Sequence, residues 1–262
     1  MKTRIIALLA LLSMSPSGAA FAQTAGLASL ESGCETELKL LERACEKREA
    51  DALDGYGASL LSAQTELKKK GDIVGWTAIE EEKKRFFDSG KTVVEAAKAK
   101  HDLVSEAANA YLDALAKAED NKNTEAVKLF GRYTNQVSVL IRNLMQADKM
   151  EDAKVARAEL DRAAFLLADY QTKAPAPGTM IMYFGGGGRM EFVKVLNGWV
   201  GRYEVTNGEY RRFKPDHNSG NYEGHGLNGD RQPAVQVDYK DAVAFASWLN
   251  RACSSQIPAG YT

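Results

Sequence analysis

The sequence predicts an all-α region of helical hairpins or coiled coil, followed by a smaller α+β domain. Apolar residues recur every three or four positions through the first part of the chain, which is the spacing of a buried helical face. A segment containing proline and glycine then breaks this pattern, and short β-rich runs separated by glycines follow. We therefore expect a signal peptide at 1–22, a helical region at 23–172, a linker at 173–188 and a second domain at 189–262.

The first 22 residues have the composition of a secretory signal peptide. Lys2 and Arg4 form a positive start, an apolar core runs from Ile5 to Met14, and Ala20-Phe21-Ala22 fits an A-x-A cleavage site. Such a core is too short to span a bilayer, which takes roughly 20 residues. We therefore expect a cleaved signal and a periplasmic or secreted protein, rather than an uncleaved membrane anchor.

The charge balance limits the classes of partner. Removing Lys2 and Arg4 with the signal leaves 32 basic against 35 acidic residues, a net charge of −3. This value argues against a nucleic-acid partner, because a nucleic-acid-binding domain carries a clustered basic face. The later apolar runs are also too short for a membrane span, so we expect no transmembrane segment.

The three cysteines, Cys34, Cys45 and Cys253, make a poor disulfide framework for an exported protein. Cys34 and Cys45 lie three helical turns apart, so on one helix their Cα atoms would be about 16 Å apart. A disulfide needs less than about 7 Å between Cα atoms. We expect buried, unbridged thiols on an apolar stripe, with an interchain bridge as the alternative.

The first predicted helix runs from Leu27 to Lys70, and its apolar positions follow coiled-coil spacing. Lysines and then Gly71-Asp72 end it, because basic residues and glycine suit a helix C-terminus. Such a stripe can pair between chains, so it predicts self-association through residues 27–70 as a dimer or trimer. The stripe consists of Leu27, Leu30, Cys34, Leu38, Leu41, Cys45, Ala52, Tyr56, Leu60, Ala63 and Leu67.

The remaining helices are separated by polar or glycine-containing breaks at 88–90, 120–123 and 147–150. Nothing in this region has a catalytic pattern: His101 is expected to be a solvated surface residue, and the charged run 80–85 a solvated face. The helices between the breaks are expected at 73–87, 93–119, 124–146 and 151–170.

A weak repeat with an offset of 77 residues runs through the helical region. Each copy has the pattern of helix, short turn and helix, which is an antiparallel hairpin. Two copies are too few to predict a solenoid, and chance similarity between helical segments is the alternative. The repeat aligns Tyr56, Leu60, Leu67, Ile73, Glu82 and Arg85 with Tyr133, Val137, Leu144, Met150, Glu159 and Arg162.

The second domain begins with three β-rich runs at 180–184, 190–196 and 199–205. Gly185–Gly188 lies between two of these runs rather than before a helix, so it predicts a flexible turn and not a phosphate-binding loop. Thr206-Asn207-Gly208-Glu209 then has the T-x-x-E form of a capping box, which starts a short helix.

A second strand and capped helix are predicted further along. Val235 and Val237 alternate as in a strand, Asp238 is the expected N-cap, and Trp248 lies beside the apolar stripe of the following helix. The stripe consists of Ala242, Phe245, Ala246 and Leu249. The intervening loop predicts a solvated surface rather than a metal site, because its candidate ligands have no recognised spacing. These candidates are Asp216, His217, Glu223, His225 and Asp230.

The two capped segments together resemble the formylglycine-generating enzyme family, also called sulfatase-modifying factors. The family pattern E-V-T-N-x-x-Y-x-x-F is matched by Glu204, Val205, Thr206, Asn207, Tyr210 and Phe213. A second pattern is matched by Pro233, Val237, Ala242, Trp248 and Leu249, whereas Asp238, Tyr239 and Phe245 replace its Ser, Trp and Tyr. The resemblance covers roughly residues 189–262.

The resemblance implies an irregular α+β fold like that of C-type lectins. In complete family members it implies copper- and oxygen-dependent oxidation of a substrate cysteine to formylglycine, with a catalytic cysteine pair and calcium-binding loops. These lie beyond the segment that matches, so we expect no catalytic, cofactor-binding or metal residue here and a truncated, inactive domain with unpaired strand edges. The alternatives are a non-catalytic lectin-like module for a protein or carbohydrate ligand, and an envelope-associated structural module on a coiled-coil stalk.

Overall fold

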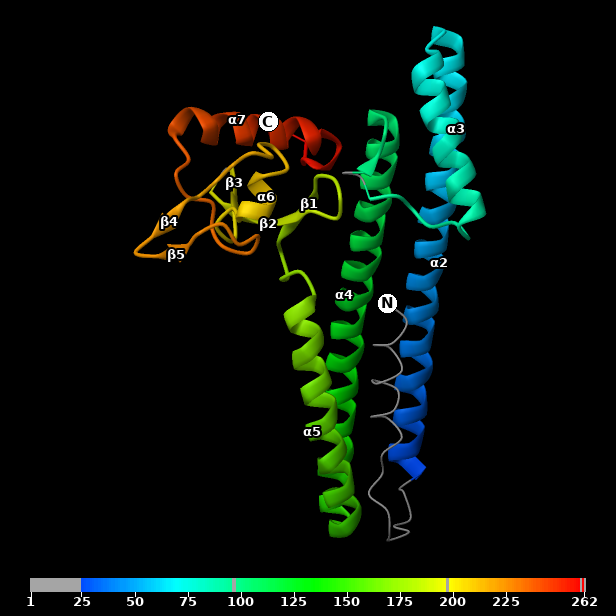
Figure 1. Cartoon of the computed structure of the whole chain (residues 1–262). Helices are drawn as coiled ribbons and strands as arrows, with labels where there is room; N and C mark the ends of the chain where they lie inside the picture. The colour runs from blue at the N-terminus through cyan, green and yellow to red at the C-terminus, as the bar shows by residue number, and fades with distance from the viewer. Residues whose placement is uncertain (1–24, 96–97, 197, 260, 262) are drawn as a thin grey trace.

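The computed structural model describes residues 25–95, 98–196, 198–259 and 261. It consists of a long helical rod with a small α+β domain on its side (Figure 1). The signal peptide predicted at 1–22 lies outside the described residues. Among the described helices, none is long and apolar enough to cross a membrane.

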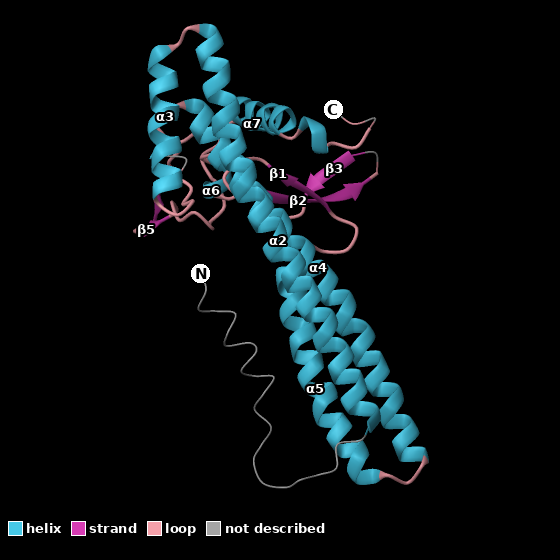
Figure 2. Ribbon diagram, turned by 90° about the vertical axis from the view of Figure 1, so that its right-hand side faces the viewer, coloured by secondary structure: helices cyan, strands magenta, loops and turns pink. Residues whose placement is uncertain are grey.

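The rod is built from two helical hairpins. Helix α2 (Ala25–Lys70) is followed by α3 (Ile73–Asp88), and α4 (Asp102–Gln146) is followed by α5 (Met150–Lys173). The two long helices lie side by side in opposite directions, with α3 on the second half of α2 and α5 on the second half of α4 (Figures 1 and 2).

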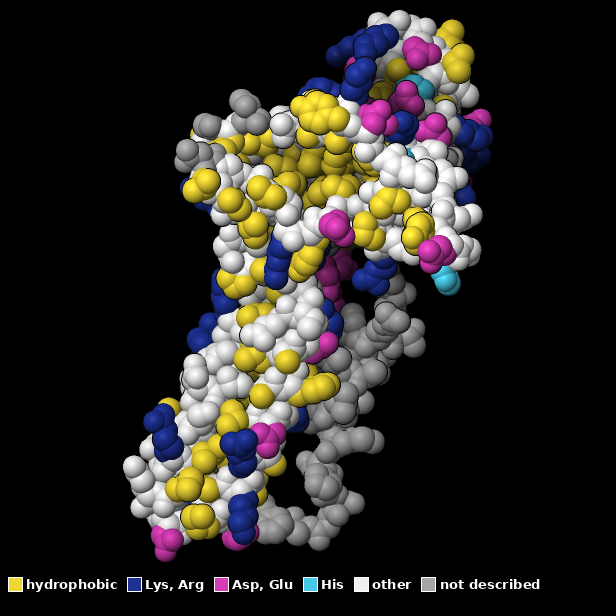
Figure 3. Space-filling model, turned by 90° about the vertical axis from the view of Figure 1, so that its left-hand side faces the viewer, with side chains coloured by type: hydrophobic (Ala, Val, Ile, Leu, Met, Phe, Trp, Pro, Cys, Tyr) yellow, Lys and Arg dark blue, Asp and Glu magenta, His cyan; other side chains and the backbone are white. Residues whose placement is uncertain are grey.

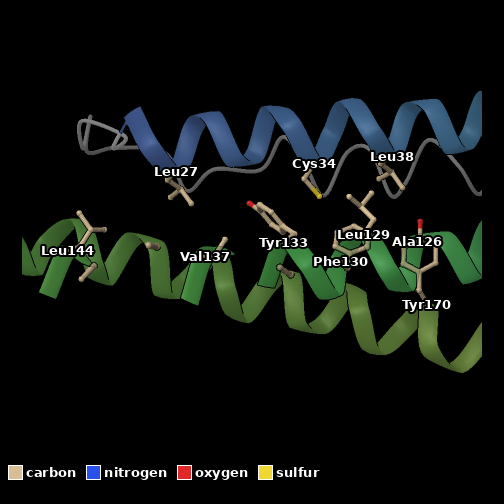
Figure 4. Packing of buried hydrophobic residues seen from close by; sticks show 13 residues of the cluster. Leu27, Cys34, Leu38, Ala126, Leu129, Phe130, Tyr133, Val137, Leu144 and Tyr170 are labelled. Carbon is tan, nitrogen blue, oxygen red and sulfur yellow. The ribbon is translucent and has the colours of Figure 1, made fainter. Parts of the chain in front are cut away.

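This arrangement creates two cores, and each core takes helices from both hairpins. In the first, Leu27 and Cys34 of α2 face Tyr133 and Val137 of α4, and α5 closes the layer (Figure 4). In the second, the second half of α2 and α3 pack against Val104 of α4. The apolar stripe predicted on α2 is therefore covered largely by helices of the same chain.

The 77-residue repeat is present in the backbone. Helices α2 and α4 begin 77 residues apart, and so do α3 and α5. The two turns also correspond, because Gly71 and Asp148 both have positive φ, at 71° and 60°. Each turn is closed by the same type of backbone bond, from Asp72 N to Leu67 O at 3.1 Å and from Lys149 N to Leu144 O at 2.9 Å.

A buried polar triad recurs at the same offset. The hydroxyl of Tyr56 donates to Glu82 Oε1 at 2.7 Å, and Arg85 donates to both carboxylate oxygens. Its counterpart is Tyr133, which donates to Glu159 Oε1 at 2.7 Å, again with an arginine, Arg162, on the same carboxylate. Both glutamates are 8% exposed. These donors offset the cost of removing a carboxylate from water.

Because the two triads are equivalent, replacing the tyrosine of either one with phenylalanine should lower the free energy of unfolding by the same amount. Tyr56→Phe and Tyr133→Phe each remove one hydroxyl donor but keep the ring, and the carboxylate retains its arginine. We expect each to lower the free energy of unfolding by about 1–2 kcal/mol. Urea denaturation followed by circular dichroism measures this. Tyr222→Phe, at an exposed position, is the matched control.

The same tyrosines predict a loss of stability at high pH. Burial, and then the hydrogen bond to glutamate, raises the pKa of Tyr56 and of Tyr133 above the ordinary value. Because the folded pKa exceeds the unfolded one, this contribution is complete below about pH 10 and is lost as the pH rises further. Each Tyr→Phe variant should therefore lose about 1 kcal/mol less than the parent between pH 8 and 11. An identical loss in parent and variants would contradict the assignment.

Three predictions in the helical region are wrong. Residues 93–95 and 98–101 of the helix expected at 93–119 are not α-helical, and the expected turn at 120–123 is instead the middle of α4. The apolar residues Val93 and Val94 are partly buried and pack against the second core from a non-helical segment. His101, expected to be solvated, is half-buried and caps α4 by accepting from Leu103 N at 3.1 Å.

The α+β domain begins with an antiparallel sheet in the order β1-β2-β3. Its core gathers aromatic and sulfur-containing side chains, with Tyr210 packed against Phe213 and Phe245. The elements are β1 (Met180–Tyr183), β2 (Arg189–Val195), β3 (Gly198–Gly201), α6 (Asn207–Tyr210), β4 (Asn221–Tyr222), β5 (His225–Gly226), α7 (Tyr239–Ala252) and a 3₁₀ turn (Ser254–Gln256).

Three details of this domain differ from the prediction. The third strand ends at Gly201, and Val235 and Val237 form no strand because Gln236 adopts a φ of 60° between them. Ala242 and Ala246 are exposed, so only Phe245 and Leu249 of the predicted stripe are buried. The outer face of α7 also exposes Tyr239 and Val243, and Figure 3 shows hydrophobic side chains gathered on this side of the domain.

Candidate functional site

The glycine loop, residues 185–188, joins the α+β domain to the rod. Gly185, Gly186 and Gly187 have backbone φ values of 100°, 60° and 73°, which residues other than glycine rarely adopt. Their turn directs two amides at α4, where Gly185 N donates to Asp113 Oδ2 at 2.8 Å and Gly187 N donates to Oδ1 at 2.9 Å. The predicted turn is present, and its amides bind a carboxylate of the chain itself.

A second acidic residue of α4 completes the contact. The hydroxyl of Tyr183 donates to Asp120 Oδ2 at 2.7 Å, and Arg189 Nη1 donates to the other oxygen. Lys117 lies between the two acids with its Nζ 4.9 Å from the centroid of the Tyr183 ring. We call these interactions of Asp113 and Asp120 with residues 183–189 the docking contact.

The electrostatics of the docking contact follow from burial. Burial raises the pKa of Asp113, and the two glycine amides and the cations Lys117 and Arg212 partly oppose this rise. Burial also raises the pKa of Tyr183, and its hydrogen bond to Asp120 adds to the effect. At neutral pH this tyrosine is therefore a hydrogen-bond donor that holds the domain on α4.

A polar cleft of about 550 Å³ opens beside the glycine loop. Its three arginines already have acceptors: Arg189 has Asp120, Arg211 has Asp230 at 2.8 Å, and Arg212 has the carbonyl oxygens of Gly185 and Gly186. None of the described residues that line it is a cysteine or histidine. The polar groups of its lining can bind a polar ligand by hydrogen bonds. It is lined by Gly187, Gly188, Arg189, Thr206, Gly208, Glu209, Arg211, Arg212 and Asp230.

The capping box predicted at 206–209 forms one wall of this cleft. Thr206 N donates to Glu209 Oε2 at 2.7 Å, and Glu209 N donates to Thr206 Oγ1 at 3.3 Å. The capped turn places the Tyr210 side chain in the core of the domain, where it is 2% exposed. The prediction of a cap followed by a packing face is therefore confirmed, although α6 itself has only four residues.

Asn207, inside the capping box, organises the long loop that follows. Its side chain is fully buried and donates to Leu227 O at 2.7 Å and to Gly229 O at 3.1 Å. Its Oδ1 accepts from the hydroxyl of Ser219, also fully buried, at 2.6 Å. The same hydroxyl accepts from Val235 N at 3.0 Å, so one asparagine ties three separate parts of the loop together.

The possible metal ligands of the loop do not converge. His217 packs on the Tyr210 ring at 4.6 Å between centroids and lies 3.1 Å from Ser219 Oγ, whereas Asp230 pairs with Arg211. Asp216, Glu223 and His225 are exposed. Within the described ranges, one group has the geometry of a metal site, and it belongs to the rod. It consists of Cys45, Glu49 and Glu119, and both glutamates are exposed.

All three cysteines are free and buried, in agreement with the prediction. Cys253, the one cysteine of the α+β domain, is fully buried, and its thiol donates to Tyr183 O at 3.5 Å. Burial raises the pKa of this thiol to about 11. A copper site of the kind that the resemblance implies uses a pair of reactive thiols. The residues described in this domain do not fit that site, because they offer a single enclosed thiol.

The sequence alone did not identify the residues of the docking contact. Asp113, Lys117 and Asp120 are spaced four and three residues apart, which places them on one face of α4. This charged stripe on one face of α4 is the signal in the sequence, but the turn-like composition of 120–123 hides it. Ser219 has no comparable signal, because serine is common in surface loops.

Comparison with known proteins places residues 176–261 in a recognised family. This segment matches the family model of the sulfatase-modifying factor enzyme 1-like domain. It begins in the linker and includes the glycine loop, the capping box and α7. No curated protein and no solved structure matches the chain. The C-terminal part of the chain is therefore similar to the sulfatase-modifying factor enzyme 1-like domain, in agreement with the resemblance identified from the sequence.

Proposed function

We propose that this is an exported protein in which the helical rod supports a sulfatase-modifying-factor-type domain that does not itself oxidise cysteine. The composition of residues 1–22 supports export. The docking contact supports the role of the rod, because two carboxylates of α4 fix the domain at the glycine loop. The irregular, C-type-lectin-like fold that the family implies is part of this proposal.

The observation that carries the proposal is the state of Cys253. Oxidation of thiols and their binding to metals proceed through the thiolate, which needs access and a low pKa. Cys253 has neither, because it is fully buried and its pKa is raised to about 11. The other two cysteines are on α2, where burial also raises their pKa values.

A binding role is the alternative function, and the loop at 214–232 favours it. Asn207 and Ser219 hold the base of this loop in place, whereas Tyr222 at its tip is 66% exposed. An exposed tyrosine on a fixed loop suits recognition of a protein or carbohydrate ligand. Self-association through residues 27–70 remains a prediction. It would use side chains outside the buried stripe, such as Leu40 and Leu61.

The test combines thiol labelling with an activity assay on the whole chain. Iodoacetamide should leave Cys253 unmodified in the native protein and label it after denaturation. Incubation with Cu⁺, oxygen, a reductant and a cysteine peptide of the sulfatase type should yield no aldehyde. Aldehyde formation that is lost in Cys253→Ser but kept in Cys45→Ser would overturn the proposal. A mature chain that begins at Gln23 in the periplasmic fraction would support export.

A further inference from the structure

The free end of the first hairpin has an unusual surface. We call residues 68–76, which join α2 to α3, the hairpin tip. Ile73 and Val74 are 77% and 82% exposed there, next to the exposed lysines Lys68 and Lys69. Figure 1 shows that this end extends beyond the α+β domain, and Figure 3 shows basic and hydrophobic side chains together at that end of the molecule.

The fold of the turn does not require these side chains. Asp72 caps α3 by accepting from Gly75 N at 2.9 Å, and Gly71 supplies the positive φ. The exposed residues take no part in these contacts. β-Branched residues in an exposed first turn add little to helix stability, so their presence calls for another explanation.

The second hairpin provides an internal comparison, because its turn has the same backbone geometry. Lys69 corresponds to Gln146, Lys70 to Ala147 and Val74 to Glu151. The second turn thus lacks the basic run and has an acidic residue in place of an exposed valine. Its methionines, Met145 and Met150, are about half exposed, so the difference between the two ends is mainly one of charge.

We propose that the hairpin tip docks on an anionic lipid surface. Ile73 and Val74 enter the boundary between headgroups and acyl chains, and the lysines contact lipid phosphates. Trp76, half-buried at the edge of a hollow of about 520 Å³, adds an aromatic side chain of the type enriched at membrane interfaces. A lipid surface fits better than a protein partner, because the most exposed side chains of the tip are two aliphatic ones flanked by lysines.

Charge complementarity decides which surface the tip binds. Two aliphatic side chains alone give weak insertion, and each lysine near an anionic surface adds attraction that salt screens. Lys70 also pairs with Glu66, so Lys68 and Lys69 are the main contributors. Binding should therefore require anionic lipid and should weaken at high ionic strength.

Vesicle co-sedimentation tests the proposal with the purified chain. The parent should pellet with vesicles of phosphatidylglycerol and phosphatidylcholine but not with phosphatidylcholine alone. Two tip variants, Ile73→Ser/Val74→Ser and Lys68→Gln/Lys69→Gln, should each bind about tenfold more weakly. The matched control is Met145→Ser/Met150→Ser at the opposite end, which should bind like the parent.

The parent and all variants are the mature chain from Gln23, which lacks the apolar segment Ile5–Met14, so differences among them report the substituted residues. Circular dichroism and the urea midpoint confirm that each variant is folded. Binding that the tip variants retain in full, or that the control loses to the same extent, would overturn the proposal. So would a parent chain that binds neither type of vesicle, or that is retained by neutral vesicles equally well.

Discussion

Replacing Asp113 and Asp120 together with alanine should free the α+β domain from the rod while both parts stay folded. Asp120 is 7% exposed and accepts from Tyr183 and Arg189, and Asp113 accepts from two glycine amides. The double variant removes all four bonds and leaves partly buried donors without these acceptors. The cores of the rod and of the domain contain neither residue, so the change acts on the junction between them.

The free energy that the double variant removes from the junction between the domain and the rod can be estimated. Breaking a buried ion pair by removing one partner costs about 3–5 kcal/mol. Arg189 is about one-third exposed and also contacts Glu191 at 3.4 Å, so the value for Asp120 falls at the lower end. Loss of the acceptor for two glycine amides adds about 1–3 kcal/mol. A junction weakened by several kcal/mol should be open for a measurable fraction of the time.

Limited proteolysis and small-angle X-ray scattering measure this release. In the double variant, cleavage at residues 174–179 of the linker should accelerate and the radius of gyration should increase, whereas the helical circular dichroism should not change. Glu106→Ala, an exposed carboxylate on the same helix, is the control. Cleavage at the parental rate would show that other contacts hold the domain.

Asn207→Ala should produce the second large effect, a loss of order across the loop at 214–232. The asparagine side chain is fully buried and has hydrogen bonds to Leu227 O, Gly229 O and Ser219 Oγ. Alanine removes the partner of all three groups, of which Ser219 is buried, Leu227 is half-buried and Gly229 is exposed. The expected cost is about 3 kcal/mol for the domain, since each unsatisfied buried group costs about 1–3 kcal/mol and water will reach some of them.

Hydrogen exchange with mass spectrometry can separate this effect from general unfolding. In Asn207→Ala, amides of 214–235 should exchange faster, whereas those of the rod should be unchanged. Ser219→Ala should have a smaller effect, because Asn207 retains its bonds to the two carbonyl groups. Asn221→Ala, at an exposed loop position, should match the parent. An equal effect of Asn207→Ala and Asn221→Ala would contradict the organising role of Asn207.

Local signals predicted the elements whose ends depend on nearby residues. The glycine and aspartate at 71–72 mark the first turn, and the structure ends α2 and begins α3 there. The capping box at Thr206 and Glu209 and the N-cap at Asp238 are also confirmed. Each could be predicted because it joins residues only three positions apart. The repeat could be detected because equivalent residues have equivalent neighbours in both hairpins.

Contacts between distant residues were not predictable in the same way. The run at 120–123 has turn composition, but Asp120 pairs with Arg189 and Tyr183, more than 60 residues away, and the helix continues through it. The face of α7 was misjudged because alanines at 242 and 246 fit the buried stripe and the exposed side equally well. In the candidate site, the family pattern located Asn207, but its bonds to Leu227 and Ser219 depend on the path of the loop.

The sharing of each core between both hairpins also determines when this chain can fold during synthesis. Leu27 packs near residues 129–144, so the first residues of α2 have no native partners until roughly half of the chain has emerged. The first hairpin is likewise incomplete until Val104 is available. Pairing over such long separations slows folding. Under the export proposed above, such a delay would help to keep the chain unfolded until it has been translocated.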